Sequence, residues 1–179
     1  MRILKILDTS SIICTLTEIN EPEILLKWKA RGHELTIPNM VYKELCANKN
    51  TLSKVKPYIE ERKINITTTI KEEEVKKFKL RHLNLGNGEI SVILTSIQLN
   101  KAGEKYYAVI DDKQARKIAN LYNVNLTGTI GLLMGLKSKG LIDTKYYDKV
   151  REKFRNSQFH INVTELEEEY GSRSEIKRS

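Results

Sequence analysis

Short apolar runs alternate with longer amphipathic stretches along most of the chain. Runs rich in apolar and β-branched residues, bounded by polar or turn-forming residues, are typical of strands. The first run, Ile-Leu-Lys-Ile-Leu, is mostly apolar, which indicates a strand covered on both faces. The predicted strands are residues 3–7, 35–37, 64–68, 106–110 and 124–126.

The stretches between these runs have the pattern and the end signals of helices. Thr9 and Ser10 can cap the helix after the first strand, and Pro38 opens another. Pro57 weakens the helical pattern around it, and Leu83 is expected on the inward face of a charged amphipathic helix. Helices are predicted from Pro38 onward and over residues 9–20, 22–30, 51–62, 71–83, 90–99, 113–122, 128–139 and 143–156.

Strands that alternate with helical stretches indicate an α/β fold. We predict a three-layer α/β/α sandwich around a central, mostly parallel sheet, with functional groups at the carboxyl ends of its strands. Residues 1–156 form one domain in this interpretation, and residues 157–179 form an acidic, partly flexible tail. The tail holds five acidic and three basic residues, so the domain is more basic than the net charge of +8 for the whole chain.

Charge and composition narrow the classes of function. The excess of basic residues favours a polyanionic partner such as RNA. No run approaches the ~20 apolar residues of a membrane-spanning helix, and the apolar stretch before Asp8 is too short for a signal peptide. We therefore expect a cytoplasmic protein with no membrane partner. The two cysteines and three histidines are scattered, which argues against a zinc site.

Acidic side chains stand where the predicted strands end and helices begin. Asp8 follows the first strand, and Glu44 lies early in the helix after the second. Glu89 follows a Gly-Asn-Gly turn, and Asp111 and Asp112 follow the fourth strand. Carboxylates gathered at one sheet edge would repel one another unless a cation offset their charge. Oxygen ligands suit Mg²⁺ or Mn²⁺, ions that activate water for attack on a phosphodiester.

Each of these acids also has an ordinary structural role. Asp8 can cap the helix after it, Glu89 can interact with its helix dipole, and Glu44 can be a solvated helix residue. One member of the Asp111–Asp112 pair is enough for a cap, so the second indicates function. The joint pattern favours a phosphodiester hydrolase, because the sequence lacks the P-loop, the G-x-S-x-G elbow and the dinucleotide-binding fingerprint.

Four segments that carry these acids resemble the PIN domain family, in particular its small prokaryotic members close to VapC-type toxins. The likeness extends over about residues 1–145, and the order and spacing of the segments are more specific than any one of them. The later stretch LTGTIGLL at 126–133 resembles a subgroup of the family. The four segments are ILDTSSII at 6–13, IPNMVYKEL at 37–45, LGNGEISVIL at 85–94 and VIDDKQARKIA at 109–119.

The resemblance implies a PIN-like sandwich that cleaves RNA with Mg²⁺ or Mn²⁺. Ser10 resembles a hydroxyl that supports the metal site in relatives. Glu89 stands where many relatives have aspartate, and Ile110 stands where threonine or serine is common. The catalytic, metal-binding acids that the resemblance implies are Asp8, Glu44, Glu89 and Asp112, with Asp111 as a further metal ligand.

We therefore predict a metal-dependent endoribonuclease that hydrolyses RNA phosphodiester bonds, and a candidate toxin of a toxin–antitoxin pair. Its predicted partners are RNA, a small antitoxin protein and, as the resemblance implies, a second copy in a homodimer. Lys113, Arg116 and Lys117 are candidate contacts to the RNA backbone. Two alternatives stay open: a catalytically weak or inactive PIN-like module that binds RNA or protein, and a phosphatase that acts on small esters.

Overall fold

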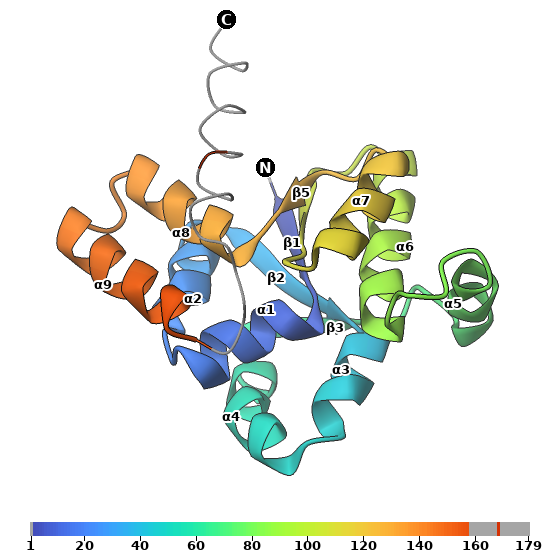
Figure 1. Ribbon diagram of the computed structural model, residues 1–179, viewed down its shortest axis with the longest axis horizontal. Coiled ribbons are helices and arrows are strands. Elements are labelled where there is room, and N and C mark those ends of the chain that lie inside the picture. Colours follow the sequence, from blue (N-terminus) through green and yellow to red (C-terminus); the bar gives the residue numbers. More distant parts are fainter. Residues whose placement is uncertain (1, 158–167, 169–179) are drawn as a thin grey trace, which may run out of the picture.

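Five parallel strands form one sheet at the centre of the molecule (Figure 1). The computed structural model describes residues 2–157 and residue 168. The strand order is β3-β2-β1-β4-β5, and every neighbouring pair is parallel. The strands are β1 (Ile3–Leu7), β2 (His33–Pro38), β3 (Ile64–Thr67), β4 (Tyr106–Val109) and β5 (Leu126–Thr127).

Helices cover both faces of the sheet, which confirms the predicted α/β/α sandwich (Figure 1). On one face, α6 packs against β1, β2 and β4, with α3, α5 and α7 beside it. On the other face, α2 packs against β2, α8 packs against α2, and α9 packs against α8. The helices are α1 (Thr9–Ile13), the π-helix η1 (Cys14–Glu18), α2 (Glu23–Ala30), α3 (Asn39–Cys46), α4 (Lys49–Glu60), α5 (Glu72–Lys79), α6 (Asn87–Lys101), α7 (Lys113–Leu121), α8 (Thr129–Ser138) and α9 (Thr144–Arg155).

Strand β1 lies in the middle of the sheet, and both of its faces are covered. Ile6 and Leu7 point to opposite faces and are fully buried. This position explains why the first run of the sequence is apolar almost throughout rather than alternating.

The order of the strands fixes where a site can form. The chain first builds β2 and β3 on one side of β1, and then crosses over to build β4 and β5 on the other. The helices that follow neighbouring strands therefore diverge at the carboxyl ends of β1 and β4. In open α/β sheets this switch point is the usual place for a functional site.

One local prediction from the sequence is confirmed and another is wrong. The helix expected over 51–62 is α4, although its bounds are shifted by two residues. Pro57 lies inside α4 without ending it, and the side chain of Asn48 caps that helix by accepting hydrogen bonds from the amides of Asn50 (3.0 Å) and Thr51 (3.1 Å). Leu83 was expected to face inward on a helix over 71–83. Helix α5 ends at Lys79 instead, and Leu83 is 73% exposed, so that prediction was wrong.

The last described helix is fixed to the body by a buried acid. Glu21 accepts hydrogen bonds from the hydroxyl of Tyr146 (2.9 Å) and from the ammonium group of Lys153 (2.6 Å), and both donors lie on α9. The predicted acidic tail falls mostly on residues 158–167 and 169–179, which lie outside the described residues. Along the described part of the chain, no helix has the length and apolar character needed to cross a membrane.

Candidate active site

Four helices begin near the carboxyl edge of the sheet, and the first turn of each is bonded to an acidic side chain. These helices are α1, α6, α7 and α8, and they follow β1, the 80–86 segment, β4 and β5. The first amides of a helix have no partner within it, and the helix dipole makes its N-terminus attractive to negative charge. The bonded acids are the five that the sequence predicted: Asp8, Glu44, Glu89, Asp111 and Asp112.

Asp8 is buried at the end of β1 and caps α1. Its Oδ1 accepts a hydrogen bond from the amide of Ser11 at 2.7 Å, and its Oδ2 accepts one from the hydroxyl of Ser10 at 2.8 Å. The side chain is only 1% exposed. Burial, together with the negative charge of Asp111, raises the pKa of Asp8 to about 7 despite these bonds. Ser10 thus contacts Asp8, one of the acids of the metal site that the resemblance implies Ser10 supports.

Asp111 lies close enough to Asp8 for its charge to raise the pKa of Asp8, and it is fixed by the first residue of α8. The amide of Thr129 donates to Oδ1 at 2.7 Å, and the hydroxyl of Thr129 donates to Oδ2. Burial raises the pKa of Asp111, while the bonds from Thr129 and the charge of Arg116 act in the opposite direction. Gly128 leaves room for this carboxylate, because a Cβ there would lie 2.7 Å from Oδ1.

Glu44 reaches from α3 to the start of α6. Its Oε1 accepts a hydrogen bond from the amide of Gly88 at 2.7 Å, and its Oε2 accepts one from the hydroxyl of Thr9. A Cβ on Gly88 would lie 2.3 Å from Oε2 of Glu44 and 2.8 Å from the Thr9 hydroxyl. The glycine of the Gly-Asn-Gly turn is therefore needed for Glu44 to occupy this position.

Glu89 and Asp112 complete the group. Oε2 of Glu89 accepts a hydrogen bond from the amide of Gly86 at 2.8 Å, and Oδ1 of Asp112 accepts one from the amide of Ala115 at 2.7 Å. Burial, followed by the charges of Asp112 and Glu44, raises the pKa of Glu89. The five acids thus form two neighbouring sets: Asp8 with Asp111, and Glu89 with Glu44 and Asp112.

The donor chemistry of this group fits a hard divalent cation. All the donors are carboxylate or hydroxyl oxygens. Burial raises the pKa values of Asp8, Asp111 and Glu89, and neighbouring negative charge, which a cation would offset, raises those of Asp8 and Glu89 further. Among residues 2–157 and 168, no three acidic, histidine or cysteine side chains are already grouped as ligands of one ion. Each carboxylate is bonded to a helix start instead.

The three basic residues that follow the Asp111–Asp112 pair differ in their exposure to solvent. Lys113 and Lys117 are exposed on α7, where they can meet a polyanion. Arg116, which the sequence analysis grouped with them, is 6% exposed, and its Nη1 donates to the carbonyl oxygens of Ile110 (2.8 Å) and Thr127 (3.1 Å). The prediction that Arg116 contacts the RNA backbone is therefore corrected. Arg116 instead links the ends of β4 and β5 beside Asp111.

Sequence reasoning missed the residues that position the carboxylates. Thr9 and Thr129 donate to Glu44 and Asp111, and Gly88 and Gly128 make room for those two acids. Thr9 was interpreted only as a helix cap. The stretch LTGTIGLL, which contains Thr129, was noted only as a resemblance.

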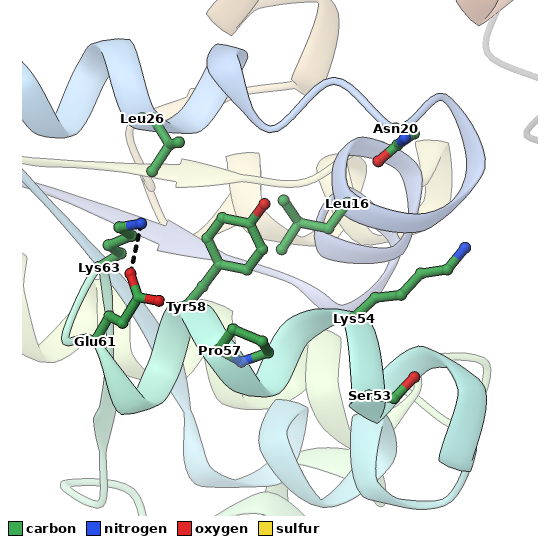
Figure 2. Close-up of a pocket in the computed structure, with 9 residues that line it drawn as sticks. All are labelled: Leu16, Asn20, Leu26, Ser53, Lys54, Pro57, Tyr58, Glu61 and Lys63. Carbon is green, nitrogen blue, oxygen red and sulfur yellow. Dashed lines mark ion pairs between the residues drawn. The ribbon is translucent and has the colours of Figure 1, made fainter.

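A separate cavity of about 450 Å³ lies between η1 and α4, away from the acids (Figure 2). Leu16, Pro57 and Tyr58 form much of its wall, and Glu61 at its edge is paired with Lys63 at 2.6 Å. None of the five candidate acids lines it. The predicted chemistry therefore belongs to the sheet edge and not to this cavity.

A family model described as a PIN domain matches residues 5–172 of the chain. No curated protein matches it.

Replacement of Asp8 by asparagine removes a charge that the fold tolerates poorly. Because the pKa is raised to about 7 on folding, the folded state binds more protons than the unfolded state from about pH 4 to pH 7, and stability falls as the pH rises through this window. In EDTA, we expect Asp8→Asn to be more stable than wild type by on the order of 2 kcal/mol above pH 7, with little difference near pH 4. Urea denaturation across this range measures the difference.

The matched control is Asp143→Asn. Asp143 caps α9 through the amide of Tyr146 at 2.7 Å, but it is exposed and lies outside the acidic group. Because Asp143 is exposed, we expect the stability difference between wild type and Asp143→Asn to change less with pH than the difference for Asp8→Asn. A stability difference for Asp8→Asn that stayed constant from pH 4 to pH 7 would contradict the raised pKa of Asp8, which burial and the charge of Asp111 cause.

Proposed function

The chain belongs to the PIN domain family, and we propose that it is a Mg²⁺- or Mn²⁺-dependent endoribonuclease. The fold is of the nuclease type, and PIN domains are generally hydrolases that use divalent metals. The single observation that carries the finer proposal is the arrangement of Asp8 and Asp111, two neighbouring carboxylates at the strand switch point, with three further acids beside them.

A site used only for binding RNA would not favour this arrangement. Five acids next to a phosphate backbone repel it, so their collection is costly unless a cation enters with the substrate. Asp8 and Asp111 are the costliest of the five, since they are neighbours and burial raises both pKa values. In a metal-dependent nuclease this repulsion is useful, because it favours binding of the cation.

The residues of the chain would divide the work as follows. Asp8, Glu44, Glu89, Asp111 and Asp112 would hold the metal, which when bound supplies charge neutralisation and a water of lowered pKa. Ser10 and Thr129 fix the orientation of Asp8 and Asp111 through their hydroxyl groups.

The proton of the attacking water also needs an acceptor. Oε1 of Glu89 accepts no hydrogen bond from any described residue, whereas Oε2 is bonded to the amide of Gly86. We assign Oε1 the role of proton acceptor. No side-chain nucleophile is required, and the phosphodiester bond is broken by water.

Recognition of RNA in this proposal rests on charge. Lys113 and Lys117 are exposed, four residues apart on α7, and follow Asp112 directly. Contacts of this kind attract a phosphate backbone without reading its sequence. A toxin role, a small antitoxin and a homodimer come from the resemblance alone. No observation on the described residues favours them, so they stay predictions.

The direct test is cleavage of RNA by the purified protein in Mg²⁺, in Mn²⁺ and in EDTA. We expect metal-dependent cleavage that falls about 100-fold or more in the Asp8→Asn, Asp112→Asn double variant, because the metal loses two charged ligands. Asp143→Asn, which alters an equivalent helix cap outside the site, should cleave like wild type. Metal-independent RNA binding without cleavage would favour the binding module, and hydrolysis of a small phosphate ester alone would favour a phosphatase.

Two glycines of one turn offer a second test of the geometry. Gly88→Ala places a Cβ 2.3 Å from the Glu44 carboxylate and must displace it, whereas a Cβ at Gly86 makes no contact closer than 3.6 Å. We expect Gly88→Ala to lower the rate of RNA cleavage about tenfold or more, and Gly86→Ala to leave it nearly unchanged. Circular dichroism should show both variants folded. Equal rates for the two variants would show that the position of Glu44 does not matter for cleavage.

A further inference from the structure

A cavity of about 360 Å³ lies on the α2–α8 face of the sheet. Lys5 of β1 and Tyr107 of β4 are paired across the sheet and form its floor, and Trp28 of α2 and Met134 of α8 contribute to its wall. None of the five candidate acids lines this cavity, so it is distinct from the proposed nuclease site.

Lys5 is a buried cation without an acidic partner. Lys5 is 3% exposed, and its ammonium group has no hydrogen bond or ion pair with any described residue. Its ammonium nitrogen lies 4.2 Å from the centre of the Trp28 ring and 5.0 Å from that of Tyr107. Contacts with ring faces offset only part of the cost of removing a charge from water. Burial and the nearby charge of Lys139 accordingly lower the pKa of Lys5 to about 8.

His33 adds a second unsatisfied group to the same wall. Its Nδ1 is buried and has no hydrogen-bond partner among the described residues, and its ring meets Trp28 edge-on at 4.7 Å. Burial and the charges of Lys5, Lys139 and Arg31 lower the pKa of His33 to about 4, so the ring is neutral at pH 7. Within the described residues the cavity thus has surplus positive charge and no acid on its lining.

The rest of the wall is mainly apolar and closely fitted. Ile3 and Leu132 line it beside Met134. Gly135 lets α8 approach α2, because a Cβ at this position would lie 2.8 Å from Cζ2 of Trp28. The indole of Trp28 is itself fixed, since its N–H donates to the carbonyl oxygen of Leu132 at 3.1 Å. An apolar wall with one convergent charge is typical of a small-molecule site.

We propose that this cavity binds a small organic carboxylate with an apolar body. The carboxylate pairs with the ammonium group of Lys5, and the apolar body lies against Trp28, Leu132 and Met134. Of the two lysines on the lining, Lys5 is buried and Lys139 is exposed. One buried cation balances one negative charge, so a monoanion fits better than a phosphate dianion. The volume of about 360 Å³ is at the small end of the usual range for ligand sites.

The proposal is tested with benzoate as the probe and the indole N–H of Trp28 as the reporter. The chain contains a single tryptophan, so its indole gives one nitrogen–proton NMR signal that reports on this wall. We expect benzoate to shift that signal saturably. Benzamide, benzylamine and inorganic phosphate should leave it nearly unmoved, because they lack the charge or the apolar body. No shift with a millimolar excess of benzoate, or an equal shift with benzamide, would overturn the proposal.

Lys5→Met tests the role of the charge. Methionine keeps the unbranched stem and removes a desolvated cation, so the variant should fold. We expect its affinity for benzoate to fall about tenfold or more. Lys54→Met, which removes an exposed lysine beside the other cavity, should bind like wild type. Unchanged affinity in Lys5→Met would overturn the proposal, and the comparison of benzoate with benzamide on wild type decides it if that variant does not fold.

Discussion

Backbone amides at the starts of four helices hold five carboxylates at one edge of the sheet, and the proposed chemistry depends on this interaction. Each acid receives a hydrogen bond of 2.7–2.8 Å from a backbone amide at a helix start, either in the first turn or, for Glu89, at the N-cap residue Gly86. The amides and the helix dipoles offset part of the repulsion between the carboxylates. They do not remove it, because, after burial, the charges of neighbouring acids still raise the pKa values of Asp8 and Glu89. The fold therefore maintains a negatively charged group that a cation can stabilise further.

The parallel sheet makes this arrangement possible. Because β1 is central and the chain crosses over between β3 and β4, the helices after β1, β4 and β5 all begin at the same edge. Buried apolar residues such as Ile6 and Val109 hold these strands in register, so the capping acids cannot move apart freely. Arg116 adds a brace between the ends of β4 and β5. The helix starts, rather than flexible loops, thus fix the geometry of the candidate site.

Much of this could be predicted from the sequence, because its signals are local. The apolar run over 3–7 and the acids that follow the strands can be identified from neighbouring residues alone. The structure places these acids in two neighbouring sets, Asp8 with Asp111 and Glu89 with Glu44 and Asp112. What could not be predicted depends on contacts between distant segments. The bond from Thr9 to Glu44 spans 35 residues, and the bond from Thr129 to Asp111 spans 18. The burial of Arg116 and the exposure of Leu83 also depend on packing that no local pattern records.

The most direct test of the central claim is where a paramagnetic ion binds. Substoichiometric Mn²⁺ broadens the NMR signals of nearby amides in a ¹⁵N-labelled protein. If Mn²⁺ binds at the five acids, broadening will be strongest at the amides bonded to them, those of Ser11, Gly86, Gly88, Ala115 and Thr129. We also expect Asp8→Asn to weaken this effect. Broadening centred elsewhere, for example around the buried acid Glu21, or no selective broadening at all, would contradict the claim that the four helix starts build a metal site.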